Sequence, residues 1–209
     1  MCGGLAYRVL KYIRLRAPTN ISSIFLFCAG ACGAATLAFA ATFAAAQGRG
    51  ETHTADAAVK RPNGTTASAK LAATIESFAT DAERDALIAG VGKGGTAARD
   101  LLASRKDAGS IQVGATRTPV KYAYARTTGS GRLITLVTAQ PIHFVGGDLP
   151  DAKSKAGYDL GLVLLDLAAS KPGGGEVAPA AKVKVDAQKA IVTEDYGAEV
   201  VRLSNVARQ

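Results

Sequence analysis

Tryptophan is absent from this 209-residue chain, and methionine, histidine and cysteine are scarce, with one, two and three residues respectively. All three cysteines, Cys2, Cys28 and Cys32, lie near the N-terminus. The rest of the chain therefore offers no disulfide, no thiol nucleophile and no cysteine ligand for a metal. Phenylalanine and tyrosine make up only 6% of the residues, which argues against an aromatic platform for carbohydrate.

Charge is missing from a long stretch that follows the first residues. No charged residue occurs in residues 17–48, and Ile21–Ala46 is almost wholly apolar. A basic start, an apolar middle and a small-residue end are typical of a secretory signal peptide. We expect residues 1–46 to be such a signal, cleaved after Ala46, with cleavage after Ala40 as the second choice. The basic residues that precede the stretch are Arg8, Lys11, Arg14 and Arg16.

Two other fates of this leader stay open. The first is an uncleaved membrane anchor, because roughly 20 apolar residues suffice to span a bilayer. The second is a lipid anchor on Cys32, because the pattern AGAC loosely matches a lipoprotein processing site. We favour cleavage, since alanine and glycine are weak membrane formers and the apolar stretch continues beyond Cys32.

The leader also accounts for part of the basic charge. The whole chain has a formal net charge of +8, and four of its 25 basic residues lie in the leader. The remaining 21 basic residues against 17 acids give residues 47–209 a net charge of +4. These basic residues form no cluster with interleaved aromatics. We expect no nucleic-acid partner, and no membrane partner after the signal is removed.

The domain organisation follows from a change of pattern along the chain. Residues 47–65 are small and polar without an apolar period, which is typical of a flexible linker. A β-rich exported domain is expected over residues 66–209, with a first strand in Ser68–Phe78. Two short helices should follow near the start of the domain. The first begins at Thr80, three residues before a glutamate in a capping-box pattern, and the second opens near Thr96.

From Ser110 onward apolar residues recur with a period of two, and turns separate short runs of β-formers. Two such runs flank the sequence TGSG at residues 128–131, where glycine supplies the positive φ of a tight hairpin. We expect about eight antiparallel strands, closed as a sandwich or barrel that hides its edges. The predicted fold class is α+β, mainly antiparallel β with two short helices.

A glycine-rich stretch, GVGKGGT (Gly90–Thr96), is the feature closest to a phosphate-binding loop. The Walker pattern requires a glycine where Leu87 stands and a serine or threonine where Gly94 stands. A helical pattern precedes the stretch, whereas such loops follow a buried strand. We therefore expect a turn between two helices, with Lys93 in it, and no cofactor.

Few side chains are candidates for chemistry, and we assign none to catalysis, cofactor binding or metal binding. His53 lies in the expected linker, and His143 lies beside a proline in a long connection. His143, Asp148 and Asp151 form a conceivable metal set, but their segment is loop-like. An ordinary surface role is the simpler interpretation of both histidines.

Carboxylates and tyrosines offer two further candidate sites. Tyr122, Tyr124 and Arg126 alternate along one expected strand, and such a face either binds a ligand or belongs to the core. Glycoside hydrolysis by paired carboxylates requires two acids in one cleft. For the four acids that could form such a pair, a position at a solvated strand end is the simpler interpretation. The acids concerned are Asp159, Asp166, Glu194 and Asp195.

Six segments follow one another in a characteristic order: TIESFATDAERDALI, GSIQVGATRTPVKYAYA, RLITLVTAQPIHF, YDLGLVLLDL, GGGEVAPAAKVKV and EDYGAEVVRLSNV. In this order they resemble a family of small exported bacterial proteins of unknown function. The resemblance spans roughly Ala73–Val206, and the chain departs from the family pattern at Gln140, where arginine is expected, and at Asp195, where asparagine is expected. The resemblance implies export and the fold, and it brings no activity, cofactor or site.

These observations favour an exported, periplasmic or extracellular domain without enzymatic activity. We expect it to bind a partner protein, an envelope component or a small apolar ligand through its sheet face or barrel mouth. The alternative is a hydrolase that uses carboxylates, with or without a metal. That alternative predicts a cleft in which two acids, or an acid and His143, approach one another.

Overall fold

The computed structural model describes residues 50–144, 149–150, 156–168 and 172–209. The expected signal peptide, residues 1–46, lies outside these ranges. Neither helix within them combines the length and the apolarity needed to cross a membrane.

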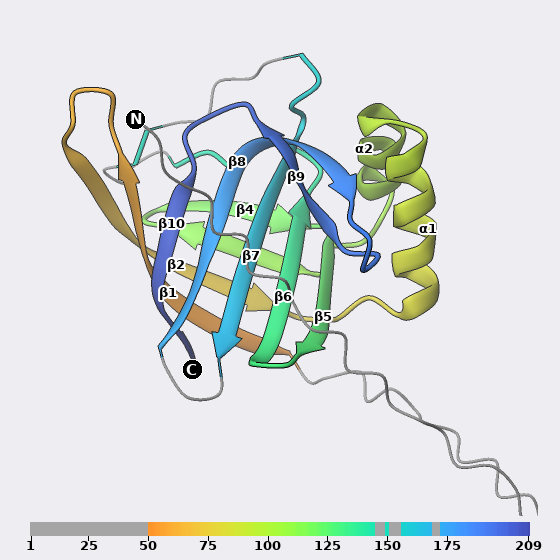
Figure 1. The fold of residues 1–209 in the computed structure, drawn as a ribbon, viewed down its shortest axis with the longest axis horizontal. Coiled ribbons are helices and arrows are strands. Elements are labelled where there is room, and N and C mark those ends of the chain that lie inside the picture. The colour runs from red at the N-terminus through yellow and green to blue at the C-terminus, as the bar shows by residue number, and fades with distance from the viewer. Residues whose placement is uncertain (1–49, 145–148, 151–155, 169–171) are drawn as a thin grey trace, which may run out of the picture. The chain divides into compact units, whose positions relative to one another are not determined.

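Ten strands and two helices form the described part of the chain (Figure 1). In chain order they are β1 Glu51–Lys60, β2 Thr66–Ile75, α1 Asp81–Gly92, α2 Gly95–Ala103, β3 Gly109–Val113, β4 Thr116–Val120, β5 Tyr122–Thr128, β6 Gly131–Thr138, β7 Leu160–Ala168, β8 Gly173–Val185, β9 Ile191–Tyr196 and β10 Val201–Arg208.

The expected antiparallel β architecture is confirmed, with ten strands instead of about eight. Residues 51–60 form β1, so the prediction of a linker over residues 47–65 is wrong for most of its length. β4 was also not among the expected strands, and it contains Pro119. β4 ends the sheet path, and an end strand tolerates the loss of one ladder donor. The helices follow β2, so they lie mid-chain and not at the start of the domain.

All ten strands belong to one sheet with the order β4-β3-β2-β1-β10-β8-β7-β6-β5, and β9 pairs with β8 beside this path. β1–β4 cross behind β5–β8 and β10 (Figure 1). The end strands β4 and β5 are joined through Lys121 alone, whose backbone N–H donates to the Val137 carbonyl over 3.0 Å. The sheet thus folds back on itself at Lys121 and forms a nearly closed barrel.

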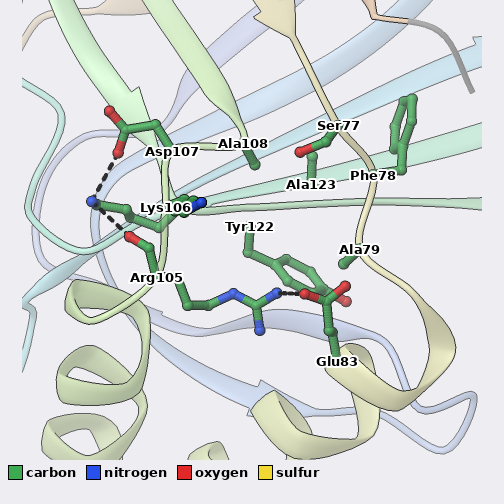
Figure 2. Close-up of a pocket in the computed structure, with 11 residues that line it drawn as sticks. Ser77, Phe78, Ala79, Glu83, Arg105, Lys106, Asp107, Ala108, Tyr122 and Ala123 are labelled. Atoms are coloured by element: carbon green, nitrogen blue, oxygen red, sulfur yellow. Dashed lines mark hydrogen bonds and ion pairs between the residues drawn. The ribbon is translucent and has the colours of Figure 1, made fainter. Parts of the chain in front are cut away.

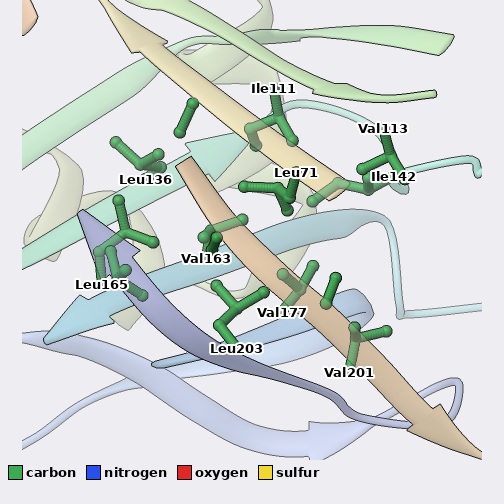
Figure 3. Packing of buried hydrophobic residues seen from close by; sticks show 14 of the residues in the cluster. Leu71, Ile111, Val113, Leu136, Ile142, Val163, Leu165, Val177, Val201 and Leu203 are labelled. Carbon is green, nitrogen blue, oxygen red and sulfur yellow. The ribbon is translucent and has the colours of Figure 1, made fainter. Parts of the chain in front are cut away.

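Apolar side chains from both groups of strands fill the barrel interior (Figure 3). β1 shows how the alternation works, because Ala55, Ala57 and Val59 are buried while the residues between them are half-buried. The larger inward side chains include Leu71, Ile111, Leu136, Val163, Leu165, Val177 and Leu203.

A second apolar layer lies outside the barrel, where α1, α2 and β9 pack against the outer face of β5–β8. Leu87 of α1 and Leu102 of α2 are fully buried in this layer. The predicted capping box of α1 is confirmed: the Glu83 backbone N–H donates to the Thr80 hydroxyl, and the Thr80 N–H donates to the Glu83 carboxylate. The predicted turn between the helices is also confirmed, with Lys93 ending α1 and Gly94, at φ 114°, preceding α2.

Candidate functional site

The outer face of β5 carries three of the side chains that the sequence marked as a possible ligand face. Tyr122, Tyr124 and Arg126 alternate with Ala123 and Ala125, which belong to the barrel interior. The two tyrosine rings stack with centroids 6.3 Å apart and an interplanar angle of 16°. The strand period therefore places all three predicted residues on the same side of the sheet, toward α1.

A small pocket of about 90 Å³ opens on this face, between α1 and the turn that joins β8 to β9. Among the described residues, its lining includes three cationic side chains, Arg84, Arg126 and Lys189, and no carboxylate. The buried Thr135 of β6 is also part of the lining. An excess of positive charge at a half-enclosed polar site favours an anionic ligand.

The Arg84 guanidinium is hydrogen-bonded to three neighbouring side chains. It donates to the Tyr124 hydroxyl over 2.6 Å and to the carboxylates of Asp81 and Asp85, each over 3.0 Å. The hydrogen bond to Asp85 is the main reason why the pKa of Arg84 is raised. The Tyr124 hydroxyl in turn donates to Asp81 over 2.9 Å. Arg84 therefore shapes one wall of the pocket, and two carboxylates balance its charge.

Arg126 differs from Arg84 because its charge has no such balance. Its Nε is buried and has no hydrogen-bond partner among the described residues. A guanidinium stays protonated in proteins, so this N–H remains a donor without an acceptor. Burial also raises the pKa of Tyr122, so the Tyr122 phenol stays protonated at neutral pH.

The turn over the pocket is held firmly by Asp186. The Asp186 carboxylate accepts from the backbone N–H groups of Gln188 and Ala190, over 2.9 and 2.8 Å. Lys189 has a φ of 56°, in the left-handed region that non-glycine residues rarely occupy. The turn thus keeps Lys189 at the pocket in a backbone conformation that glycine would adopt more easily.

A larger neighbouring pocket of about 310 Å³ shares Tyr122 as a wall (Figure 2). Four of its five charged side chains are paired within the protein, and the fifth is Lys106. Arg105 bonds the Glu83 carboxylate, and the Lys121 ammonium contacts Asp107 over 2.8 Å and the Arg105 carbonyl over 3.0 Å. This pocket therefore adds contact area beside Tyr122 with little unbalanced charge.

A third pocket, of about 260 Å³, lies at the turn between α1 and α2. Asp159 and Glu194, two of the four acids considered for hydrolysis, both line it together with Lys182. The other two acids lie elsewhere: Asp166 is exposed on β7, and Asp195 accepts a hydrogen bond from the Tyr158 hydroxyl.

The structure does not test the conceivable metal set of His143, Asp148 and Asp151. His143 is exposed, and Asp148 and Asp151 lie outside the described residues. Within the described ranges, no group of three or more His, Cys, Asp or Glu side chains is arranged to hold a metal ion.

His53 is not in a linker, because it lies on the inward face of β1 with 1% of its surface exposed. Its Nε2 is 3.5 Å from the buried Glu51 carboxylate, which Arg132 contacts over 2.7 and 3.0 Å and Arg208 over 3.5 Å. Burial lowers the pKa of His53, although Glu51 acts to raise it. Sequence reasoning missed this cluster, in which a carboxylate and an imidazole are both buried.

Together the fold and site define a barrel-like antiparallel domain with a cationic pocket under its helical layer. No protein-family model, curated protein or solved structure matches the chain.

Proposed function

We propose that this protein is an exported domain, periplasmic or extracellular, that binds a ligand or partner without enzymatic activity. The binding surface is the outer face of β5 with the two pockets that meet at Tyr122. The observation that carries the proposal is the Tyr122–Tyr124–Arg126 face, which α1 and the β8–β9 turn leave partly open. The barrel interior, by contrast, is occupied by packed apolar side chains.

The titration behaviour of this face also favours binding over proton transfer. General acid or base catalysis is most effective when a group has a pKa near the working pH. The raised pKa values of Tyr122, Tyr124 and Arg84 move these groups further from neutrality. Such groups hold fixed hydrogen-bonding roles, which suits recognition.

The first test concerns export. The full 209-residue sequence is expressed, and the N-terminus of the protein recovered from the periplasm or medium is sequenced. We expect the recovered chain to begin at Gln47. A chain that begins at Met1 and stays in the membrane fraction would contradict export with cleavage.

The second test concerns binding. Native mass spectrometry of the exported protein should show a co-purified small molecule that is lost in Tyr124→Ala. Tyr196→Ala is the matched control, because Tyr196 is 38% exposed on β9 and does not line either pocket beside Tyr122. Equal loss in both variants, or no bound species in either, would count against this face as the binding surface.

One observation favours the alternative of carboxylate-dependent hydrolysis, namely that Asp159 and Glu194 line one pocket. A hydrolase of this kind should lose activity on ester or glycoside substrates in Asp159→Asn and keep it in Asp166→Asn. Activity that survives in Asp159→Asn and in Glu194→Gln would remove this candidate.

A further inference from the structure

We propose that the pocket between α1 and the β8–β9 turn binds an oxyanion, the carboxylate or phosphate group of a ligand, through Arg126 and Lys189. This inference rests on the proposed binding function and names the chemical group that the site accepts. It follows from four features of the pocket: an unpaired arginine donor, the local charge balance, the size and polarity of the lining, and the conformation of Lys189.

The first feature is the buried Nε of Arg126, which has no acceptor in the described part of the chain. A buried polar group without a partner destabilises the folded state, more so when it is charged. An oxyanion seated against Arg126 supplies the missing acceptor, and arginine matches carboxylate and phosphate with two parallel N–H donors.

The second feature is charge balance, which separates this pocket from its two neighbours. The pocket at Tyr122 and Arg105 includes Glu83 and Asp107 in its lining, and the pocket at the helix turn includes Asp159 and Glu194. Only the Arg126 pocket, among these three, has cations in its lining without any acid. Asp81 and Asp85 lie nearby, but both bond Arg84.

The third feature is the size and polarity of the lining. The volume of about 90 Å³ is roughly three times the ~30 Å³ that one water occupies in the liquid, so it fits a group of a few heavy atoms. Thr135 and Tyr122 line the pocket together with the cations, and each carries a hydroxyl, a group that can donate to an oxyanion. A carboxylate or a phosphate fits both the volume of the pocket and the polarity of its lining.

The fourth feature is the left-handed backbone of Lys189, with φ 56°. Glycine would relieve this strain, yet a lysine occupies the position and lines the pocket. A lysine at this turn adds a second cation to the lining that contains Arg126. Replacing Lys189 with glycine should therefore weaken anion binding but not stability, so one variant separates the two effects.

The test is a titration of the protein purified after expression of the full sequence, followed by nuclear magnetic resonance of the arginine Nε–H signals. Sodium acetate and sodium phosphate are the two probes, and sodium chloride at equal ionic strength is the blank. We expect a saturable shift of the Arg126 Nε–H signal with at least one probe and none with chloride. The probe that binds more tightly tells a carboxylate ligand from a phosphate ligand.

Arg126→Met should raise the Kd for the probe at least about tenfold, since a charge-assisted hydrogen bond is lost. Arg117→Met is the matched control, because Arg117 is exposed on β4 and undergoes the same change of charge. Lys189→Gly should weaken binding several-fold while the melting temperature stays equal or rises. Because Arg126→Met lacks the Arg126 Nε–H signal, binding to the variants is followed through the nuclear magnetic resonance signals of Thr135 and Tyr122.

Several results would overturn the inference. They are a linear shift without saturation, equal loss of binding in Arg126→Met and Arg117→Met, and unchanged affinity in both Arg126→Met and Lys189→Gly. If the oxyanion fails to bind while a co-purified molecule still depends on Tyr124, the charge assignment is wrong and the proposed binding face stands. If both fail, the binding face itself is wrong.

Discussion

At the scale of single residues, His53 and Glu51 form the most unusual contact of the interior. Both nitrogens of the buried His53 ring lack a hydrogen-bond partner among the described residues. Two arginines instead surround the neighbouring Glu51 carboxylate. Because burial is the largest influence on the pKa of His53, the ring stays neutral in the folded protein below the pH at which a free histidine takes up a proton.

This contact predicts how stability depends on pH. The pKa of His53 is lowered from 6.5, so the unfolded chain binds the proton more readily than the folded one. The free energy of unfolding should therefore be highest above about pH 6.5 and fall as the pH drops through the lower folded pKa. Urea unfolding at a series of pH values between about 5 and 8 measures this slope.

The matched variants for this prediction are His53→Leu and His143→Gln. His53→Leu should flatten the slope in that window, whereas His143→Gln should keep it, because His143 is exposed. A slope that persists in His53→Leu would assign the effect to another group.

At the scale of elements, glycines in β8 allow the central strands to pack closely. A Cβ added at Gly175 would stand 2.1 Å from the Leu164 carbonyl oxygen of β7, closer than atoms approach. A Cβ added at the adjacent Gly174 would meet nothing nearer than 3.7 Å. The close approach of β7 therefore requires glycine at position 175 but not at position 174.

Gly175→Ala should destabilise the protein by about 3 kcal/mol, because backbone must move to make room in a packed sheet. Gly174→Ala should change the free energy of unfolding by less than about 1 kcal/mol. Chemical denaturation of both variants measures the difference. Similar values for the two variants would show that the close approach of β7 and β8 is not as the structure has it.

How far the elements were predictable depends on the range of the interactions that form them. The capping box at Thr80 and the turn between α1 and α2 are local, and both are found as expected. β1 was missed because its inward face begins with Glu51 and His53, a polar start that arginines from β6 and β10 make tolerable. Nothing in the sequence of residues 51–60 predicts that arginines from β6 and β10 will contact Glu51.

At the scale of the whole molecule, one sheet serves two apolar layers. β6 contributes Leu136 to the barrel interior and Val137 to the layer under the helices. Loss of the helical layer would expose the apolar side chains on the outer face of the strands that enclose the barrel interior. The helices should therefore unfold together with the barrel.

Leu102→Ala tests this coupling, because Leu102 of α2 is fully buried in the helical layer. We expect a loss of about 3 kcal/mol and a single unfolding transition by both far-ultraviolet circular dichroism and tyrosine fluorescence. Leu136→Ala, in the barrel interior, should shift the same transition. Two separate transitions in Leu102→Ala would show that the helical layer unfolds by itself.

The candidate site was predictable in part. Period-two alternation places Tyr122, Tyr124 and Arg126 on one face, and the structure confirms that they share it. The contributions of Arg84, Thr135 and Lys189 were not expected, since they come from α1, β6 and the β8–β9 turn. The only local signal was Asp186, an aspartate suited to a turn in which Lys189 takes positive φ.

The sequence by itself determined the elements whose causes are local: helix caps, hairpin turns and the alternation of apolar residues along strands. Tertiary structure alone decided that the sheet closes at Lys121, that a polar segment becomes β1, and that Arg126 and Lys189 line one pocket. The physical reason is range. Hydrogen bonds within a turn or helix end involve residues close in sequence, whereas burial, charge balance and barrel closure depend on groups that only the completed fold brings together.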